Sequence, residues 1–349
     1  MSNESAFYSE EIKKITKIEF GVFTNKEVKT YSAVSSDPFG INLSESYENY
    51  EPKKGGLVDS RMGTCDALIR CSTCNLNYIE CPGHFGHIEL ADYVFHYGFL
   101  DHLKSIIQCI CTKCSNILIE KKDAKFTKIL YKRSDARFKE IKSLTKNVNF
   151  CWNCGTPVPK IKKDINISKI LINLVSEREV GVQLTDEKTG EVLDQVKKIT
   201  EILTPRDCYN ILRNISDNDC MLLGFNPKVA RPEDLIIIRF PVPPVVIRPS
   251  SKVDLLASST MEDSLTLKIS DIITVNQRLR AQMNKETSET TNMTFQNTPH
   301  ALLQYHVATF FDNDTILPKS EFKTGTAIKS ISERIKGKTG RVRSNLMGN

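Results

Sequence analysis

No stretch of the 349-residue sequence comes near the roughly 18 consecutive apolar residues that a membrane-spanning helix needs. The longest apolar run, residues 235–247, is interrupted by Arg239 and by prolines. The N-terminal residues lack the basic and then apolar pattern of a secretory signal. Hydrophobic residues make up 40% and charged residues 26% of the chain, which excludes wholesale disorder and fibrous repeats. We therefore expect a soluble, intracellular protein without a membrane partner.

Positive charge is unevenly distributed along the chain, although the net charge is only +6. Residues 121–150 contain 10 Lys or Arg and 3 Asp or Glu, and residues 321–349 contain 7 and 2. The rest of the chain is slightly acidic. The two basic blocks indicate a polyanionic partner, and the simpler alternative is that each block is solvated surface.

Disulfide bonds are not expected. The chain has 11 cysteines, an odd number, and no export signal accompanies them. Three pairs have the C-x-x-C spacing that brings two thiolates to one ion, so metal binding is the leading interpretation.

The first cysteine cluster has the spacing C-x2-C-x6-C-x2-H. Pro82 and Gly83 favour a tight turn between its last two members. Three thiolates and one imidazole make a closed structural zinc site. The predicted ligands are Cys71, Cys74, Cys81 and His84. His87 is a rival ligand with less suitable spacing.

The second cluster consists of two C-x-x-C turns separated by 36 residues. This spacing predicts a four-thiolate zinc site formed by Cys111, Cys114, Cys151 and Cys154. Cys109 is a possible competitor, but the matched spacing favours Cys111. The remaining cysteines have no partners at ligand spacing and are predicted to be core thiols: Cys65, Cys208 and Cys220.

Both clusters are filled by protein ligands, whereas catalytic zinc keeps an open position. We therefore predict two structural Zn²⁺ ions and no catalytic residue. A RING-type ubiquitin ligase also uses paired Cys/His turns, but its two sites interleave. A free-standing zinc-ribbon protein that binds nucleic acid is the main alternative.

Hydrophobic periodicity predicts a mixed α+β fold. Two helices with apolar stripes, joined by a polar break at 284–298, predict an antiparallel helical hairpin, with His306 as a buried or capping histidine rather than a ligand. Asp312-Asn-Asp314 is interpreted as the turn that ends the second helix. The other expected elements are a strand over 11–23 with a helix starting near Thr24, a loop over 36–60, a helix over 93–107, an exposed hairpin over 185–198, a helix over 204–215 and a buried strand over 235–240 that ends at Pro241-Val-Pro-Pro244.

Several motifs, in order, resemble the largest subunit of multisubunit DNA-directed RNA polymerase, most closely the polymerase II type. The resemblance covers nearly the whole chain and includes both cysteine clusters. Its further motifs are Phe20-Gly-Val-Phe23, Asp59-Ser-Arg-Met-Gly63, Cys81-Pro-Gly-His-Phe-Gly-His-Ile-Glu-Leu90, Leu223-Gly-Phe225, Pro241-Val-Pro-Pro244, Val246-Ile-Arg-Pro249, Gln304-Tyr-His-Val-Ala-Thr309 and Lys336-Gly-Lys-Thr-Gly-Arg341.

The resemblance implies the N-terminal part of that subunit, called the clamp. The corresponding architecture is a zinc-stabilised clamp head with a helical hairpin and irregular basic loops. Its implied units are a clamp head at 1–240 with both zinc sites, a lid-like loop at 241–262, a clamp helical hairpin at 263–311, and a rudder and switch-like basic segment at 312–349.

The switch-like segment is implied to meet template DNA and the RNA–DNA hybrid. Its basic side chains suit phosphate contacts that set position without reading sequence, and Gly337 and Gly340 allow close backbone approach. The expected contact residues are Lys329, Arg334, Lys336, Lys338, Arg341 and Arg343. Other implied partners are further polymerase subunits, especially the second-largest, and initiation or elongation factors on the hairpin.

The family's catalytic Asn-Ala-Asp-Phe-Asp-Gly-Asp loop, whose carboxylates hold Mg²⁺, is absent from this sequence. We therefore expect a piece of a multisubunit nucleotidyltransferase that is inactive alone, with Mg²⁺ bound only in the complete enzyme. The composition suits an AT-rich genome such as that of a large DNA virus. The expected location is the nucleus for a cellular protein, and the host cytoplasm or virion for a viral one.

Overall fold

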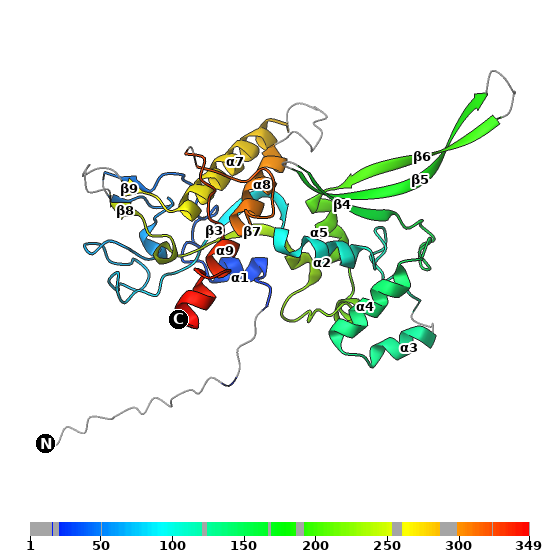
Figure 1. Cartoon of the computed structure of the whole chain (residues 1–349), viewed down its shortest axis with the longest axis horizontal. Helices are drawn as coiled ribbons and strands as arrows, with labels where there is room; N and C mark the ends of the chain where they lie inside the picture. Colours follow the sequence, from blue (N-terminus) through cyan, green and yellow to red (C-terminus); the bar gives the residue numbers. More distant parts are fainter. Residues whose placement is uncertain are drawn as a thin grey trace.

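The computed structural model describes residue 16 and residues 21–49, 51–120, 124–166, 169–185, 192–252, 260–286, 299–322 and 324–348. Most of the strand predicted over 11–23 lies outside these residues, as do residues 253–259 of the lid-like loop and most of the polar break at 284–298. The described part is a mixed α and β structure, as predicted (Figure 1). No described helix has the length and apolar character to cross a membrane.

A two-stranded antiparallel sheet lies at the centre of the body (Figure 1). It pairs β3 (Gly86–Phe95) with β7 (Ile236–Val242), and the register is irregular between Glu89 and Val94. The second strand ends within Pro241-Val-Pro-Pro, as predicted, although Pro241 and Val242 themselves still pair with β3. A proline is tolerated here because β7 is an edge strand.

The helix predicted over 93–107 begins later than expected. Residues 93–95 belong to β3, a 3-10 turn covers Tyr97–Phe99, and α2 covers Leu100–Ile107. The apolar residues at the start of the 93–107 range are typical of a buried strand as well as of a buried helix. Their pattern therefore did not show where β3 ends and α2 begins. By contrast, α5 (Pro205–Arg213) starts as predicted, with the Thr204 side chain accepting a hydrogen bond from the Asp207 backbone N–H.

Two longer helices, α7 (Ser264–Glu286) and α8 (Pro299–Phe311), pack against each other and against β3. Their amide side chains satisfy backbone groups of β3 at the irregular register. Asn276 accepts from Ala91 N–H at 2.7 Å and donates to Glu89 O at 3.0 Å. Gln304 does the same for both backbone groups of Phe95. These bonds fix the helix pair onto the sheet because buried backbone groups need partners.

A second sheet of three antiparallel strands is formed by β4, β5 and β6, and its long β5–β6 hairpin projects from the body (Figure 1). The predicted hairpin over 185–198 is therefore present but longer than expected. The strands are β4 (Lys160–Asn166), β5 (Lys169–Thr185) and β6 (Val192–Leu203). The remaining helices are α1 (Asn25–Thr30), α3 (Ala124–Leu130), α4 (Ser134–Thr145), α6 (Asp217–Leu222) and α9 (Ile331–Ile335). The short strand pairs are β1 (Tyr47–Glu48) with β2 (Glu51–Pro52), and β8 (Ser251–Lys252) with β9 (Thr260–Met261).

The buried apolar side chains form two main clusters. One gathers residues of α2, α5 and α6, and includes Cys208 and Cys220. The other lies between the β3–β7 sheet and the α7–α8 pair, and includes Phe240 and Val307. Both predicted helical stripes are therefore mostly core, although Leu267 and Leu302 are exposed.

Two arginines tie the segments that follow β7 to the rest of the body. Arg248 is almost completely buried and donates to Leu57 O, Pro243 O and the Thr266 hydroxyl. Burial lowers the pKa of its guanidinium to about 10. Arg334 of α9 forms an ion pair with Asp263 at 2.6 Å and also donates to Ser264 Oγ and Ile247 O. Arg334 thereby links the C-terminal segment to the start of α7.

Candidate metal centres and a basic surface

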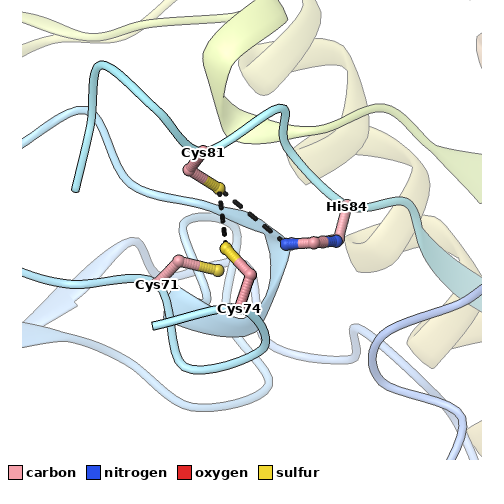
Figure 2. Close-up of side chains that lie close together, drawn as sticks. All are labelled: Cys71, Cys74, Cys81 and His84. Carbon is pink, nitrogen blue, oxygen red and sulfur yellow. Dashed lines mark hydrogen bonds between the residues drawn. The ribbon is translucent and has the colours of Figure 1, made fainter. Parts of the chain in front are cut away.

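The structure brings together the four residues predicted for the first metal site. The side chains of Cys71, Cys74, Cys81 and His84 converge from two loops (Figure 2), and their potential ligand atoms all lie within 4.8 Å of one another. Cys74 Sγ is 3.6 Å from Cys81 Sγ, and Cys81 Sγ is 3.8 Å from His84 Nε2.

The four residues predicted for the second site converge in the same way. Cys111, Cys114, Cys151 and Cys154 also place their sulfur atoms within 4.8 Å of one another. Cys111 Sγ is 3.5 Å from Cys154 Sγ, and Cys114 Sγ is 3.6 Å from Cys151 Sγ. The loop of 36 residues between the two turns thus closes on itself at the cysteines.

These distances fit tetrahedral zinc. A Zn–S bond of about 2.3 Å and tetrahedral angles place neighbouring sulfur atoms about 3.8 Å apart. The measured sulfur separations lie close to this value, and both clusters are closed sets of four. Each set could hold one structural ion, and its four protein ligands leave no position for a catalytic water.

Three of the cysteine turns share one backbone geometry. In each C-x-x-C turn, the first cysteine carbonyl accepts from the residue after the second cysteine: Asn75, Ser115 or Gly155. These three residues have positive φ angles in the left-handed region, namely 57°, 56° and 66°. In the same turns, the backbone N–H of the first cysteine donates to the carbonyl of the residue that follows the positive-φ residue. The turn orients both thiols toward one point. The C-x-x-C spacing predicted this convergence but not the backbone conformation that produces it.

Burial raises the thiol pKa of three of the ligand cysteines, Cys81, Cys111 and Cys151, and so disfavours their free thiolates. It raises the pKa of the Cys81 thiol to about 11 and that of Cys111 to about 12. The nearby Thr156 hydroxyl and backbone N–H lower the pKa of Cys154 to about 6. A bound cation would favour the thiolate form throughout, so metal binding would release protons.

The rival ligands lie elsewhere. His87 is completely buried, with its Nδ1 atom 2.7 Å from the Ser32 hydroxyl. Cys109 is buried and donates to Ser105 O, and burial raises the pKa of its thiol to about 11. Cys208 and Cys220 are core thiols as predicted, but Cys65 is exposed, and that part of the prediction was wrong. The Cys65 thiol donates to Val245 O at 3.6 Å.

Gly83, in the last turn of the first cluster, meets two constraints. Its φ is +81°, and an added Cβ would lie 2.6 Å from Pro244 Cβ and 2.7 Å from Val246 Cγ2. We expect Gly83→Ala to lower the free energy of unfolding of the zinc-loaded protein by about 3 kcal/mol, from strain and overpacking together. Gly155→Ala is the matched control, because its φ is +66° but open space surrounds it, so a loss of about 1 kcal/mol is expected. Chemical denaturation measures both, and equal losses would contradict the packing argument.

The predicted phosphate contacts lie on α9 and in the residues on either side of it. Lys329, Lys336, Lys338, Arg341 and Arg343 are exposed. Lys336 Nζ is 3.8 Å from an Asp312 carboxylate oxygen, and Arg341 donates to the Asn345 side chain. Arg334 differs from the other five, because its guanidinium is occupied by Asp263, Ser264 and Ile247. Nothing in the spacing of the basic residues distinguished it.

Comparison with known proteins identifies the family of the chain that carries these two cysteine clusters. Residues 12–346 match the family described as RNA polymerase Rpb1, domain 1. The chain is 42% identical over 347 residues to "DNA-directed RNA polymerase subunit 1" of Acanthamoeba polyphaga mimivirus, covering 97% of this chain and 22% of that protein. It is 35% identical over 352 residues to "DNA-directed RNA polymerase II subunit RPB1" of Euplotoides octocarinatus, covering 97% of this chain and 68% of that protein.

The protein is thus of the RNA polymerase largest-subunit class. More particularly, the chain belongs to the RNA polymerase Rpb1, domain 1 family. The resemblance inferred from the motifs is confirmed, and a free-standing zinc-ribbon protein is not favoured. The chain spans about a fifth of the length of the mimivirus relative.

Proposed function

We propose that this chain is the clamp portion of the largest subunit of a DNA-directed RNA polymerase, and that it grips template DNA and the RNA–DNA hybrid during transcription. The observation that carries the proposal is the family match over residues 12–346, together with two relatives named as polymerase subunits. The enzyme would be a multisubunit nucleotidyltransferase, in which this chain binds nucleic acid and supplies no catalytic residue.

The two cysteine clusters have a structural role in this proposal. Each would hold one Zn²⁺, which fixes a loop-rich region that buries few apolar residues of its own. The first would hold the loops at 71–84 against Pro244 and Val246, and the second would hold the ends of the segment 111–154. Closed thiolate and imidazole sets support this assignment.

The exposed basic side chains after α9 would provide the grip. Lys336, Lys338, Arg341 and Arg343 extend from a segment in which Gly337 has a φ of +81° and open space around it. Cations on an accessible backbone hold phosphates without selecting a base sequence, as transcription of any template requires. Arg334 would position this segment rather than contact phosphate, because its guanidinium is occupied.

The remaining units are proposed with the boundaries given by the resemblance. Residues 1–240 would form the clamp head, 241–262 the lid-like loop, 263–311 the antiparallel clamp hairpin, and 312–349 the rudder and switch-like segment. The packing of α7 against α8 supports the hairpin. Its outer surface would receive initiation or elongation factors, and the second-largest subunit would be the main protein partner.

We expect the isolated, zinc-loaded chain to incorporate no nucleotides on any template with Mg²⁺ or Mn²⁺, because the acidic metal-binding loop is absent from the sequence. Primer-extension and de novo synthesis assays measure this. The positive arm supplies the chain as a separate polypeptide to a polymerase assembled with the remainder of the mimivirus subunit. Activity that requires this chain supports the proposal, and incorporation by the pure chain alone, or no dependence on it in the assembly, contradicts it.

A further inference from the structure

The sole tryptophan of the chain lies on the second cysteine cluster, between Cys151 and Cys154. Its indole N–H donates to the carbonyl of Ile117 at 2.8 Å. Ile117 follows the turn that carries the other two cysteines. The tryptophan side chain nevertheless remains 45% exposed. Because its only polar atom is satisfied, the ring is held in one orientation with apolar surface in contact with water.

Further exposed side chains lie on the two cysteine turns of this cluster and on the residues that lead into them. Phe150, two residues before Trp152, is 65% exposed. Lys113 lies between Cys111 and Cys114, and the Asn153 side chain hydrogen bonds to Cys114, so the two turns are close enough to form one surface. Lys113, Lys146 and Asn153 are all exposed. We call these five residues the Trp152 surface.

Two residues of the Trp152 surface, Phe150 and Lys146, belong to the basic block at 121–150. Helix α4 ends at Thr145, whose hydroxyl contacts Cys109 Sγ, two residues before Cys111. Lys146 is the C-cap residue of the helix. Some cations of the block have protein partners, such as Lys142 with Ser105 and Arg137 with Met221 O. Lys139 and Lys146 are exposed, and the block as a whole has seven more positive than negative side chains.

We propose that the Trp152 surface binds single-stranded nucleic acid, with an unpaired base stacked on the Trp152 indole and backbone phosphates held by Lys113 and Lys146. Aromatic rings among cations are the general means of binding single strands without sequence preference. A duplex is disfavoured because its bases are already stacked. A protein partner fits less well, since lysine is depleted from the cores of protein interfaces. This site goes beyond the proposed function, because it lies outside the segment 312–349 and involves bases rather than phosphates alone.

The single tryptophan makes the test direct. The full-length, zinc-loaded chain is titrated with a 12-nucleotide oligothymidylate while its intrinsic tryptophan emission is recorded. Stacking of a base on the indole quenches this emission, so we expect saturable quenching that parallels the anisotropy of a labelled strand. A duplex of equal length and poly-glutamate serve as competitors, and we expect neither to reproduce the quenching.

Matched variants assign the effect to the ring. Trp152→Ala should weaken oligothymidylate binding about tenfold, whereas Trp152→Phe should retain most of it, because stacking needs a ring rather than the N–H group. Tyr78→Ala is the control, since Tyr78 is 46% exposed on the first cluster. Zinc stoichiometry is measured for each variant to show that the second cluster remains intact.

Specific outcomes would overturn the proposal. One is binding of the oligonucleotide with no change in tryptophan emission. Another is equal weakening by Trp152→Ala and Tyr78→Ala. Quenching by poly-glutamate at similar concentrations would point instead to an acidic protein partner. The quenching should persist when Lys336, Lys338, Arg341 and Arg343 are replaced, so failure of the C-terminal contact and failure of this site are distinguishable.

Discussion

Replacing Cys81 with alanine is expected to reduce bound zinc from two ions to one per chain and to unfold the region around residues 65–90. Cys81 is the buried member of the first cluster that lies within 4 Å of both Cys74 Sγ and His84 Nε2. Apparent binding energies of structural zinc are about 10–16 kcal/mol in small zinc peptides, and in such sites binding energy is folding energy. Elemental analysis and limited proteolysis of the variant measure the two effects.

Cys208→Ala is the matched control for this loss. Cys208 is also a fully buried cysteine, but it lies in the apolar cluster of α2, α5 and α6. Its removal leaves only a small cavity, so we expect a loss of about 1 kcal/mol and two zinc ions retained. Two ions bound to the Cys81→Ala protein, or fewer than two bound to the unaltered protein, would contradict the two-site assignment.

Replacing Lys336, Lys338, Arg341 and Arg343 together with alanine is expected to remove most binding of an RNA–DNA hybrid. If the C-terminal block neutralises about four to six phosphates, log K should fall against log[salt] with a slope of about −3 to −5. Loss of four cations should flatten the slope by about 3. Fluorescence anisotropy at several salt concentrations measures both the affinity and the slope.

The control set for this experiment replaces four exposed cations of the other basic block, Lys132, Arg133, Lys139 and Lys146. These changes should affect hybrid binding much less, because the hybrid presents no unpaired base to the Trp152 surface. Arg334 is left unchanged in both sets, since its removal would also break the ion pair with Asp263. Equal losses from the two sets would show diffuse charge attraction and leave the switch-like assignment without support.

The cysteine clusters could be predicted from sequence because their chemistry is local. A C-x-x-C turn places two sulfur atoms together whatever the surrounding fold, and all eight predicted ligand residues do converge. Helix starts with clear capping residues were also predictable, as Thr204 and Thr24 show. In these cases the residues that decide the structure lie within a few positions of one another.

Features that depend on distant partners could not be predicted. Nothing near Gln304 or Asn276 shows that their amides complete the backbone pairing of β3, which lies about 200 residues away in sequence. Arg334 resembled its basic neighbours until the structure placed Asp263 beside it. Likewise, the apolar residues at 93–107 gave no boundary between β3 and α2. They are apolar because they are buried, and a buried strand and a buried helix show no distinguishing periodicity.

The three contacts of Arg334 have a thermodynamic consequence for the molecule as a whole. They join the basic C-terminal segment to the first turn of α7 and to the Ile247 carbonyl. Any ligand that draws the segment away must break these contacts, and any ligand of α7 that displaces Asp263 weakens the same bonds. By linkage, the two ligands would then alter each other's affinity by the same factor, in either order of addition. One guanidinium would thus make the occupancy of the basic segment and that of the helix pair interdependent.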